Sequence, residues 1–168
     1  DPEDEDIRRV ELELWKKIRT MARKGRRTGL GITAEGDMLA ALGLRYGTPE
    51  ATAFAVKVQK TLALEAYRAS VKMAAERGAF EIFDARKEEK NPMIGRIREA
   101  DPELYAEMVK HGRRNIAMLT IAPTGTTSLM SQTTSGIEPV FRPVYKRRRK
   151  INPSDQDAKV AFVDDMGE

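Results

Sequence analysis

Residues 116–128 read IAMLTIAPTGTTS, an apolar run that ends at a proline and continues into a turn rich in hydroxyl groups. The run Ile116 to Ala122 contains strand-forming residues without polar alternation, which is typical of a strand buried on both faces of a parallel sheet. The turn after it carries one glycine among several threonines. The stretch therefore predicts a buried strand, a tight turn and a helix that starts near Ser128.

The turn itself has the composition of a phosphate-binding loop. Its small side chains let an anion approach the backbone, and a strand-to-helix turn leaves several N–H groups free at the positive end of the helix dipole. The loop lacks the lysine of a Walker A loop, so it is not a standard ATPase site. Two interpretations stay open on chemistry alone. One is a capped turn without a ligand, and the other is a phosphate site made by Pro123, Thr124, Gly125, Thr126 and Thr127.

The chain before this stretch has the apolar spacing of helices. Four helices are expected, at residues 3–24, 33–43, 48–78 and 101–112. The first should bury one apolar face, with Trp15 close to it, and should stop at Gly25. Thr33 is expected to cap the second helix, and Thr48 followed by a proline is expected to cap the third. Residues 1–112 are therefore predicted to be a mainly helical segment.

Residues 113–168 are predicted to be mainly strands. After the run at 116–122, the segment from Val140 to Ile151 is a second strand candidate, and the polar tail beyond it is expected to begin another helix. Helices followed by buried strands indicate an α/β fold. We expect the two segments, 1–112 and 113–168, to form one structural unit within a larger domain.

The amino-acid composition excludes several kinds of catalytic and structural chemistry from this chain. Of the 168 residues, 40% are hydrophobic and 33% are charged, which is ordinary for a soluble domain with a core. No apolar run is long enough to span a bilayer and no signal peptide is present, so we expect no membrane partner and a cytoplasmic location. The absence of cysteine excludes thiol catalysis and disulfides from this chain, and a single histidine, His111, argues against a histidine metal cage. Because the chain begins at Asp1 rather than at methionine, we expect a fragment, a processed product or a trimmed chain.

The net charge is only +4, but basic residues crowd the segment 142–150. This run allows an alternative function, a non-catalytic module that binds nucleic acid or phosphate. No aromatic stacking platform accompanies it, so a solvated or phosphate-facing strand is favoured and a nucleic-acid partner is not expected. Residues 29–34 match the G-x-G-x-x-A dinucleotide fingerprint. No buried strand precedes them, so we interpret them as a glycine-loosened helix start.

A resemblance to a known family runs along most of the chain. Residues 114–128 resemble the substrate-phosphate segment of adenosylcobalamin-dependent (class II) ribonucleotide reductases. The segments QTTSGIEP at 132–139 and VYKRRRK at 144–150 continue the likeness. Upstream, RTGLGI at 27–32 and LAALG at 39–43 are similar to the helical segment that precedes the loop in this family. The residues Glu35-Gly36 depart from the usual small or apolar residues there.

The resemblance implies a fragment from the C-terminal part of the barrel in the large catalytic subunit. The fold implied is a helical segment followed by strands of the ten-stranded reductase α/β barrel, incomplete at this length. The family converts ribonucleotides to deoxyribonucleotides by thiyl-radical chemistry for DNA synthesis. Its implied cofactor is adenosylcobalamin, whose site we do not place on this chain.

The loop matching Pro123 to Thr127 would hold the substrate diphosphate through backbone amides. The family's radical cysteine and reducing cysteine pair lie elsewhere in the subunit, so we assign no catalytic residue here and expect the isolated chain to be inactive. The expected partners are the ribonucleotide substrate and the remainder of the reductase subunit, in cis or as a separate chain. The resemblance does not decide between diphosphate and triphosphate substrates.

Overall fold

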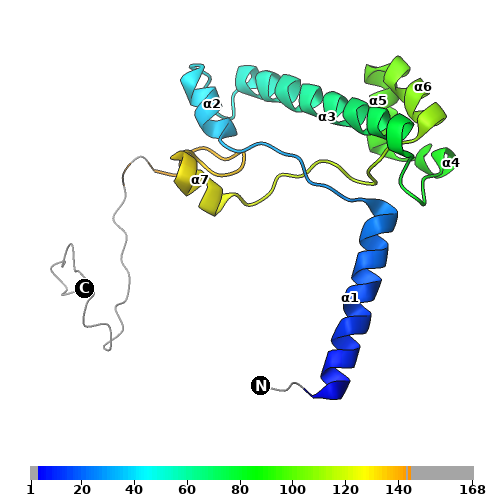
Figure 1. The fold of residues 1–168 in the computed structure, drawn as a ribbon. Helices are drawn as coiled ribbons and strands as arrows, with labels where there is room; N and C mark the ends of the chain where they lie inside the picture. Colours follow the sequence, from blue (N-terminus) through cyan, green and yellow to red (C-terminus); the bar gives the residue numbers. More distant parts are fainter. Residues whose placement is uncertain (1–3, 143, 145–168) are drawn as a thin grey trace, which may run out of the picture.

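The computed structural model describes residues 4–142 and 144, which form seven helices joined by extended segments (Figure 1). The helices are α1 (Glu5–Gly25), α2 (Glu35–Ala41), α3 (Pro49–Arg77), α4 (Ala85–Glu88), α5 (Pro92–Ala100), α6 (Pro102–His111) and α7 (Gly125–Ser131). The long helix α3 connects two groups of elements. At one end it lies beside α4, α5 and α6, and at the other it lies near α2, with α7 below α2 in this view (Figure 1).

Local caps explain where the main helices begin and end. The Thr48 side chain accepts a hydrogen bond from the Ala51 N–H at the start of α3, and Gly78 ends that helix with a φ of 82°. These bounds confirm the prediction for residues 48–78. Asn91 caps α5 in the same way, with Pro92 in the first turn, so the Asn-Pro pair begins a helix that the sequence analysis did not expect.

The apolar core lies where α5 and α6 pack on the C-terminal half of α3. Its least exposed members are Ile94, Ile97, Leu104 and Met108, each 2% exposed. From α3, Tyr67 and Val71 join the same cluster, and Met118 reaches it from the extended segment. These packed parts of α3, α5 and α6, called the body below, therefore position the chain that leads from α6 towards α7.

A buried arginine ties that segment to the core. Arg113 is 2% exposed, and its guanidinium donates hydrogen bonds to the Glu88 carboxylate at 2.8 Å and to the carbonyls of Asn115 and Ile116 at 3.1 Å each. It also lies over three aromatic rings, those of Tyr67, Phe80 and Phe83. A buried charge is tolerated when it is paired in this way, and the rings add cation–π attraction.

A second polar group fixes the end of α1 against α3. Ser70 is fully buried and donates to the Asn115 side-chain oxygen at 2.9 Å. The Asn115 amide nitrogen donates in turn to the Arg26 carbonyl at 2.8 Å. The Ile116 N–H donates to the Gly25 carbonyl at 2.9 Å. Residues 115 and 116 are therefore held between α3 and the last turn of α1.

The prediction of barrel strands is wrong for the part of the chain that the structure describes. Instead of a strand at 116–122, this segment forms one isolated parallel bridge, between Leu30 and Leu119. The Leu30 N–H donates to the Met118 carbonyl at 2.6 Å, and the Thr120 N–H donates to the Leu30 carbonyl at 2.9 Å. The described residues are thus a helical assembly with a short parallel pairing, and the expected α/β barrel architecture is not seen in them.

Hydrogen bonding explains why this pairing stays short. A regular ladder would continue with the Ile116 carbonyl accepting from Thr28, but that carbonyl accepts from Arg113 instead. The Thr28 N–H is displaced to the Ala117 carbonyl at 2.9 Å. At the other end the ladder would continue with the Ile32 N–H donating to the Thr120 carbonyl and the Ala122 N–H donating to the Ile32 carbonyl, and neither bond forms. The second predicted strand, 140–151, lies mostly outside the described residues, and residues 140–142 and 144 are not in a strand.

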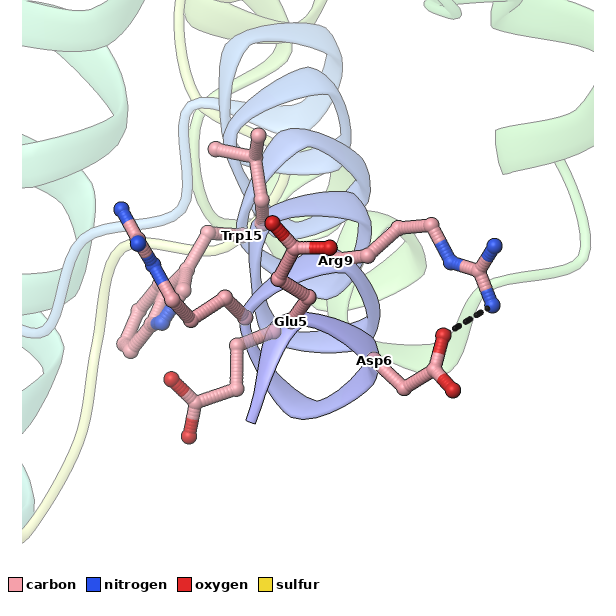
Figure 2. A pocket seen from close by; sticks show the side chains of 7 residues that line it. Glu5, Asp6, Arg9 and Trp15 are labelled. Atoms are coloured by element: carbon pink, nitrogen blue, oxygen red, sulfur yellow. Dashed lines mark ion pairs between the residues drawn. The ribbon is translucent and has the colours of Figure 1, made fainter. Parts of the chain in front are cut away.

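The prediction that α1 buries an apolar face is also wrong in this structure. Its large apolar side chains, Trp15 among them, are 45 to 64% exposed. Figure 1 shows α1 extending away from the other helices. A hollow of about 630 Å³ beside Trp15 is lined by α1 residues alone, and Figure 2 shows the Arg9–Asp6 ion pair on one side of it. One helix cannot enclose a ligand, so this hollow is open surface.

Candidate phosphate-binding site

The predicted phosphate loop forms the first turn of α7. The helix begins at Gly125, three residues before the expected start at Ser128, and Thr124 precedes it without capping it by its side chain. The first N–H that bonds back is that of Ser128, which donates to the Thr124 carbonyl at 2.8 Å. The amides of Gly125, Thr126 and Thr127 therefore have no acceptor within the helix and lie at its N-terminal end.

Space is available next to these amides. Pro123, Gly125, Thr126 and Thr127 are exposed, and Thr124 is half-buried. A Cβ placed on Gly125 would meet no atom within 4 Å. The φ of Gly125 also lies outside the left-handed region, so the local fold does not require glycine there. The absence of a side chain leaves the backbone open to a ligand.

The Thr124 hydroxyl points into the protein instead of towards this space. Its oxygen lies 2.8 Å from the Thr33 hydroxyl oxygen and accepts a hydrogen bond from the Gly136 N–H at 3.0 Å. Thr33 was expected to cap α2, and this is wrong, since Ala34 precedes α2 with a left-handed φ of 62° and no side-chain cap. Thr33 instead connects the turn before α2 to the loop before α7.

A third segment, residues 132–139, completes the arrangement. The Thr134 N–H donates to the Asp37 carboxylate at 2.8 Å, and the Thr134 carbonyl accepts from the Thr33 hydroxyl at 3.3 Å. Glu35 is buried, and its carboxylate accepts from the Gln59 side chain at 2.9 Å. Three segments far apart in the sequence therefore meet beside the loop, and the sequence analysis did not predict that Asp37 takes part.

Glycines in the 29–36 segment allow this meeting. A Cβ on Gly31 would collide with the Thr120 carbonyl, and a Cβ on Gly36 would lie 2.5 Å from the Pro139 Cα. The two glycines of the dinucleotide-like pattern therefore both pack against Thr120, Gly29 on its side chain and Gly31 on its backbone. The Glu35-Gly36 pair, noted in the sequence as unusual, has a physical reason, because the carboxylate pairs with Gln59 and the glycine admits Pro139.

A hollow of about 560 Å³ opens beside the loops and is lined by residues 121–123, 134–136 and 138–141. No lysine or arginine is among these lining residues, so N–H and hydroxyl groups are the donors that the described part of the chain offers there. Among the described residues, no three histidine, aspartate or glutamate side chains gather as a metal site. Within the same residues, no helix is both long and apolar enough to cross a membrane.

Comparison with known proteins identifies the family. The barrel domain of ribonucleotide reductases matches residues 7–165. A vitamin B12-dependent ribonucleoside-diphosphate reductase of Mycobacterium tuberculosis is 33% identical over 144 residues, which cover 85% of this chain and 18% of the relative. The corresponding enzyme of Thermoplasma acidophilum is 33% identical over 142 residues, covering 84% and 16%. A ribonucleoside-diphosphate reductase subunit alpha of Treponema pallidum is 30% identical over 134 residues, covering 74% and 15%.

This chain belongs to the ribonucleotide reductase barrel-domain family. The resemblance found in the sequence is thereby confirmed, including its direction towards vitamin B12-dependent members. The chain spans less than a fifth of the length of the relatives named above. The alternative of a basic binding module at 142–150 gains no support from these relatives, and most of that segment lies outside the described residues.

Proposed function

We propose that this chain is part of a ribonucleotide reductase that converts ribonucleotides to deoxyribonucleotides for DNA synthesis, and that it holds the substrate's phosphates. The relatives are named ribonucleoside-diphosphate reductases, which favours a diphosphate substrate. The remainder of the reductase subunit, in cis or in trans, would supply the radical chemistry. The division at residue 112 and the cytoplasmic location stay predictions.

The observation that carries the binding role is the group of free amides at residues 125–127 beside an open glycine. A phosphate oxygen that accepts from these N–H groups would also gain from the dipole of the helix turn. The exposed hydroxyls of Thr126 and Thr127 add two further donors. The hollow beside Pro123 is lined by the Glu138 side chain and by no lysine or arginine, so the remaining phosphate charge would be balanced by groups outside that lining.

Adenosylcobalamin is the cofactor proposed for the assembled enzyme, because two of the relatives are named as vitamin B12-dependent. The described residues do not fit a site for this group. Their hollows are lined by α1 alone, by α1 with residues 27, 82 and 116, or by the loops between 121 and 141, and none of these linings includes the single histidine, His111. We therefore assign no step of the reaction to cobalamin on this chain.

Substitution of the loop glycine tests the binding role. In the assembled reductase, Gly125→Val should raise the substrate KM by at least about tenfold, the equivalent of one charge-assisted hydrogen bond lost. The matched control is Gly95→Val in α5, where an added Cβ likewise meets no atom within 4 Å. Steady-state kinetics with both folded variants gives the answer. A Gly125→Val enzyme with normal KM would show that the loop is only a structural turn.

The absence of cysteine leads to a second expectation. The 168-residue chain alone should form no deoxyribonucleotide when supplied with adenosylcobalamin, a ribonucleotide and a dithiol, because none of its residues can form a thiyl radical. Product analysis by chromatography is the measurement. Deoxyribonucleotide made by clean protein would overturn the assignment of the chemistry to the rest of the subunit.

A further inference from the structure

We propose that Thr33 is a positioning residue for the phosphate loop, and that it acts through the hydroxyl of Thr124. The inference rests on the proposed function and adds to it, because it distinguishes the residues that bind the phosphate from a residue that holds the loop in position. Its basis is the hydrogen-bonded series that joins Gly136, Thr124, Thr33 and Thr134. In this arrangement the hydroxyls of Thr33 and Thr124 both bond within the protein.

The direction of the protons follows from the partners. Each threonine hydroxyl has one proton to donate. The Thr134 carbonyl can only accept, so the Thr33 hydroxyl donates to it at 3.3 Å. The Thr124 hydroxyl must then donate to Thr33 across the 2.8 Å contact, while its oxygen accepts from the Gly136 N–H at 3.0 Å. With these four groups paired, Thr124 has no proton left for a phosphate, while the buried Thr134 hydroxyl has no partner among the described residues.

The other end of this series is firmly held. Thr33 lies two residues before α2, in which Gly36 packs against Pro139 and the Asp37 carboxylate accepts from the Thr134 N–H at 2.8 Å. The 132–136 segment is thus attached to α2 independently of Thr33. Through its hydrogen bond, Thr33 holds Thr124 in a fixed position relative to α2. Thr124 is the residue immediately before the free amides of α7.

Loss of the Thr33 hydroxyl would remove none of the three amides, but it would let the loop that carries them change its orientation. The number of donors to a phosphate is unchanged, so the expected loss is one of alignment. Binding should weaken in the ground state and in the reaction alike, because the phosphates lie away from the reacting carbon and contribute uniform binding. This predicts a raised Kd and KM with little change in kcat.

The test uses the reductase assembled with the remainder of its subunit, and cytidine diphosphate and inorganic pyrophosphate as probes. Thr33→Val should raise the Kd for both probes by about fivefold to tenfold, the range for one buried hydrogen bond, with kcat within about twofold of native. Thr33→Ser, which keeps the hydroxyl, should restore binding. The control is Thr61→Val, because Thr61 is exposed on α3 and bonds only within its own helix.

A double-mutant cycle separates positioning from direct binding. If Thr33 acts through Thr124, the Thr33→Val/Thr124→Val enzyme should bind no more weakly than Thr124→Val alone. Additive losses, or native affinity in Thr33→Val, would overturn the proposal. Thr33→Ala repeats the measurement with a smaller side chain should the valine variant fold poorly. Native binding by Gly125→Val rejects the proposed function itself, whereas weak binding there with normal binding in Thr33→Val rejects only this inference.

Discussion

α1 carries large apolar side chains along its whole length, whereas α3 mixes small, polar and apolar residues. Nevertheless only Gly25 is buried in α1, while α3 buries Ala51, Tyr67, Ser70, Val71 and Ala74. The difference is the presence of partners, because α5 and α6 pack on α3 and no described element covers α1. An apolar stripe indicates which face of a helix can be buried. Burial itself requires a second surface within reach.

Polar groups show the same contrast. In the body, Arg113 and Glu88 form an ion pair whose side chains are 2% and 16% exposed, and Arg113 also lies over the rings of Tyr67, Phe80 and Phe83. On α1 the Arg9–Asp6 pair is 70% and 80% exposed and joins two neighbouring turns of one helix. Solvent screens the second pair but not the first. The interactions that stabilise the described fold are therefore concentrated in the body, where residues 113–118 pack on α3.

The largest expected effect on the free energy of unfolding comes from replacing Arg113, the buried charge of the body. Arg113→Leu removes three hydrogen bonds and leaves the Glu88 carboxylate without its cation, which should lower the free energy of unfolding by about 3–5 kcal/mol. Urea unfolding of the 168-residue chain followed by circular dichroism measures it. The control is Arg86→Leu, whose side chain is 92% exposed and should matter by under about 1 kcal/mol. Equal losses in the two variants would remove the distinction between buried and surface charge.

A smaller effect concerns the stability of the fold in acid, to which Asp101 contributes from its position between α5 and α6. The Leu104 N–H, and then the Arg68 guanidinium, hold the pKa of Asp101 below its usual 3.8. Because the folded state binds this proton more weakly, the stabilisation is complete above pH 3.8 and is lost as the pH falls through the lowered pKa. Asp101→Asn should therefore flatten the fall in stability between roughly pH 5 and roughly pH 2.

Thermal unfolding across that pH range, with Glu99→Gln as an exposed carboxylate control, measures the Asp101 contribution. The control should keep the full acid dependence of the native chain. An Asp101→Asn chain that loses stability in acid as steeply as the native protein would show that this carboxylate does not link folding to pH. Since both variants remove one negative charge, a difference between them comes from the partners of Asp101.

Sequence reasoning succeeded where the cause is local and failed where it is not. Thr48 and Gly78 frame α3 because caps act within a few residues. The turn after Pro123 also leads into a helix as expected, although that helix starts at Gly125 instead of Ser128. Thr33 was misjudged as a cap because its partners, Thr124 and Thr134, lie about a hundred residues away in the sequence. Sequence spacing does not reveal such pairings.

The strand prediction failed for a related reason. The composition at 116–122 does favour an extended chain, and the structure has one, but a strand also needs neighbours that continue the ladder. Here one neighbour, around Leu30, supplies a single bridge. Arg113 takes the carbonyl that the next pair would need. The apolar run thus predicted a strand where the structure has only the bridge at Leu119.

The smallest expected effect is a leucine truncation on α1. Leu14 is 54% exposed and Leu104, in the body, is 2% exposed. In the 168-residue chain, Leu14→Ala should change the free energy of unfolding by under about 0.5 kcal/mol, because no packed neighbour is lost and alanine favours the helix. Leu104→Ala, the same change in the body, should cost about 2–5 kcal/mol by leaving a cavity. Urea unfolding measures both, and a Leu14→Ala loss close to that of Leu104→Ala would mean that the α1 face is packed in solution after all.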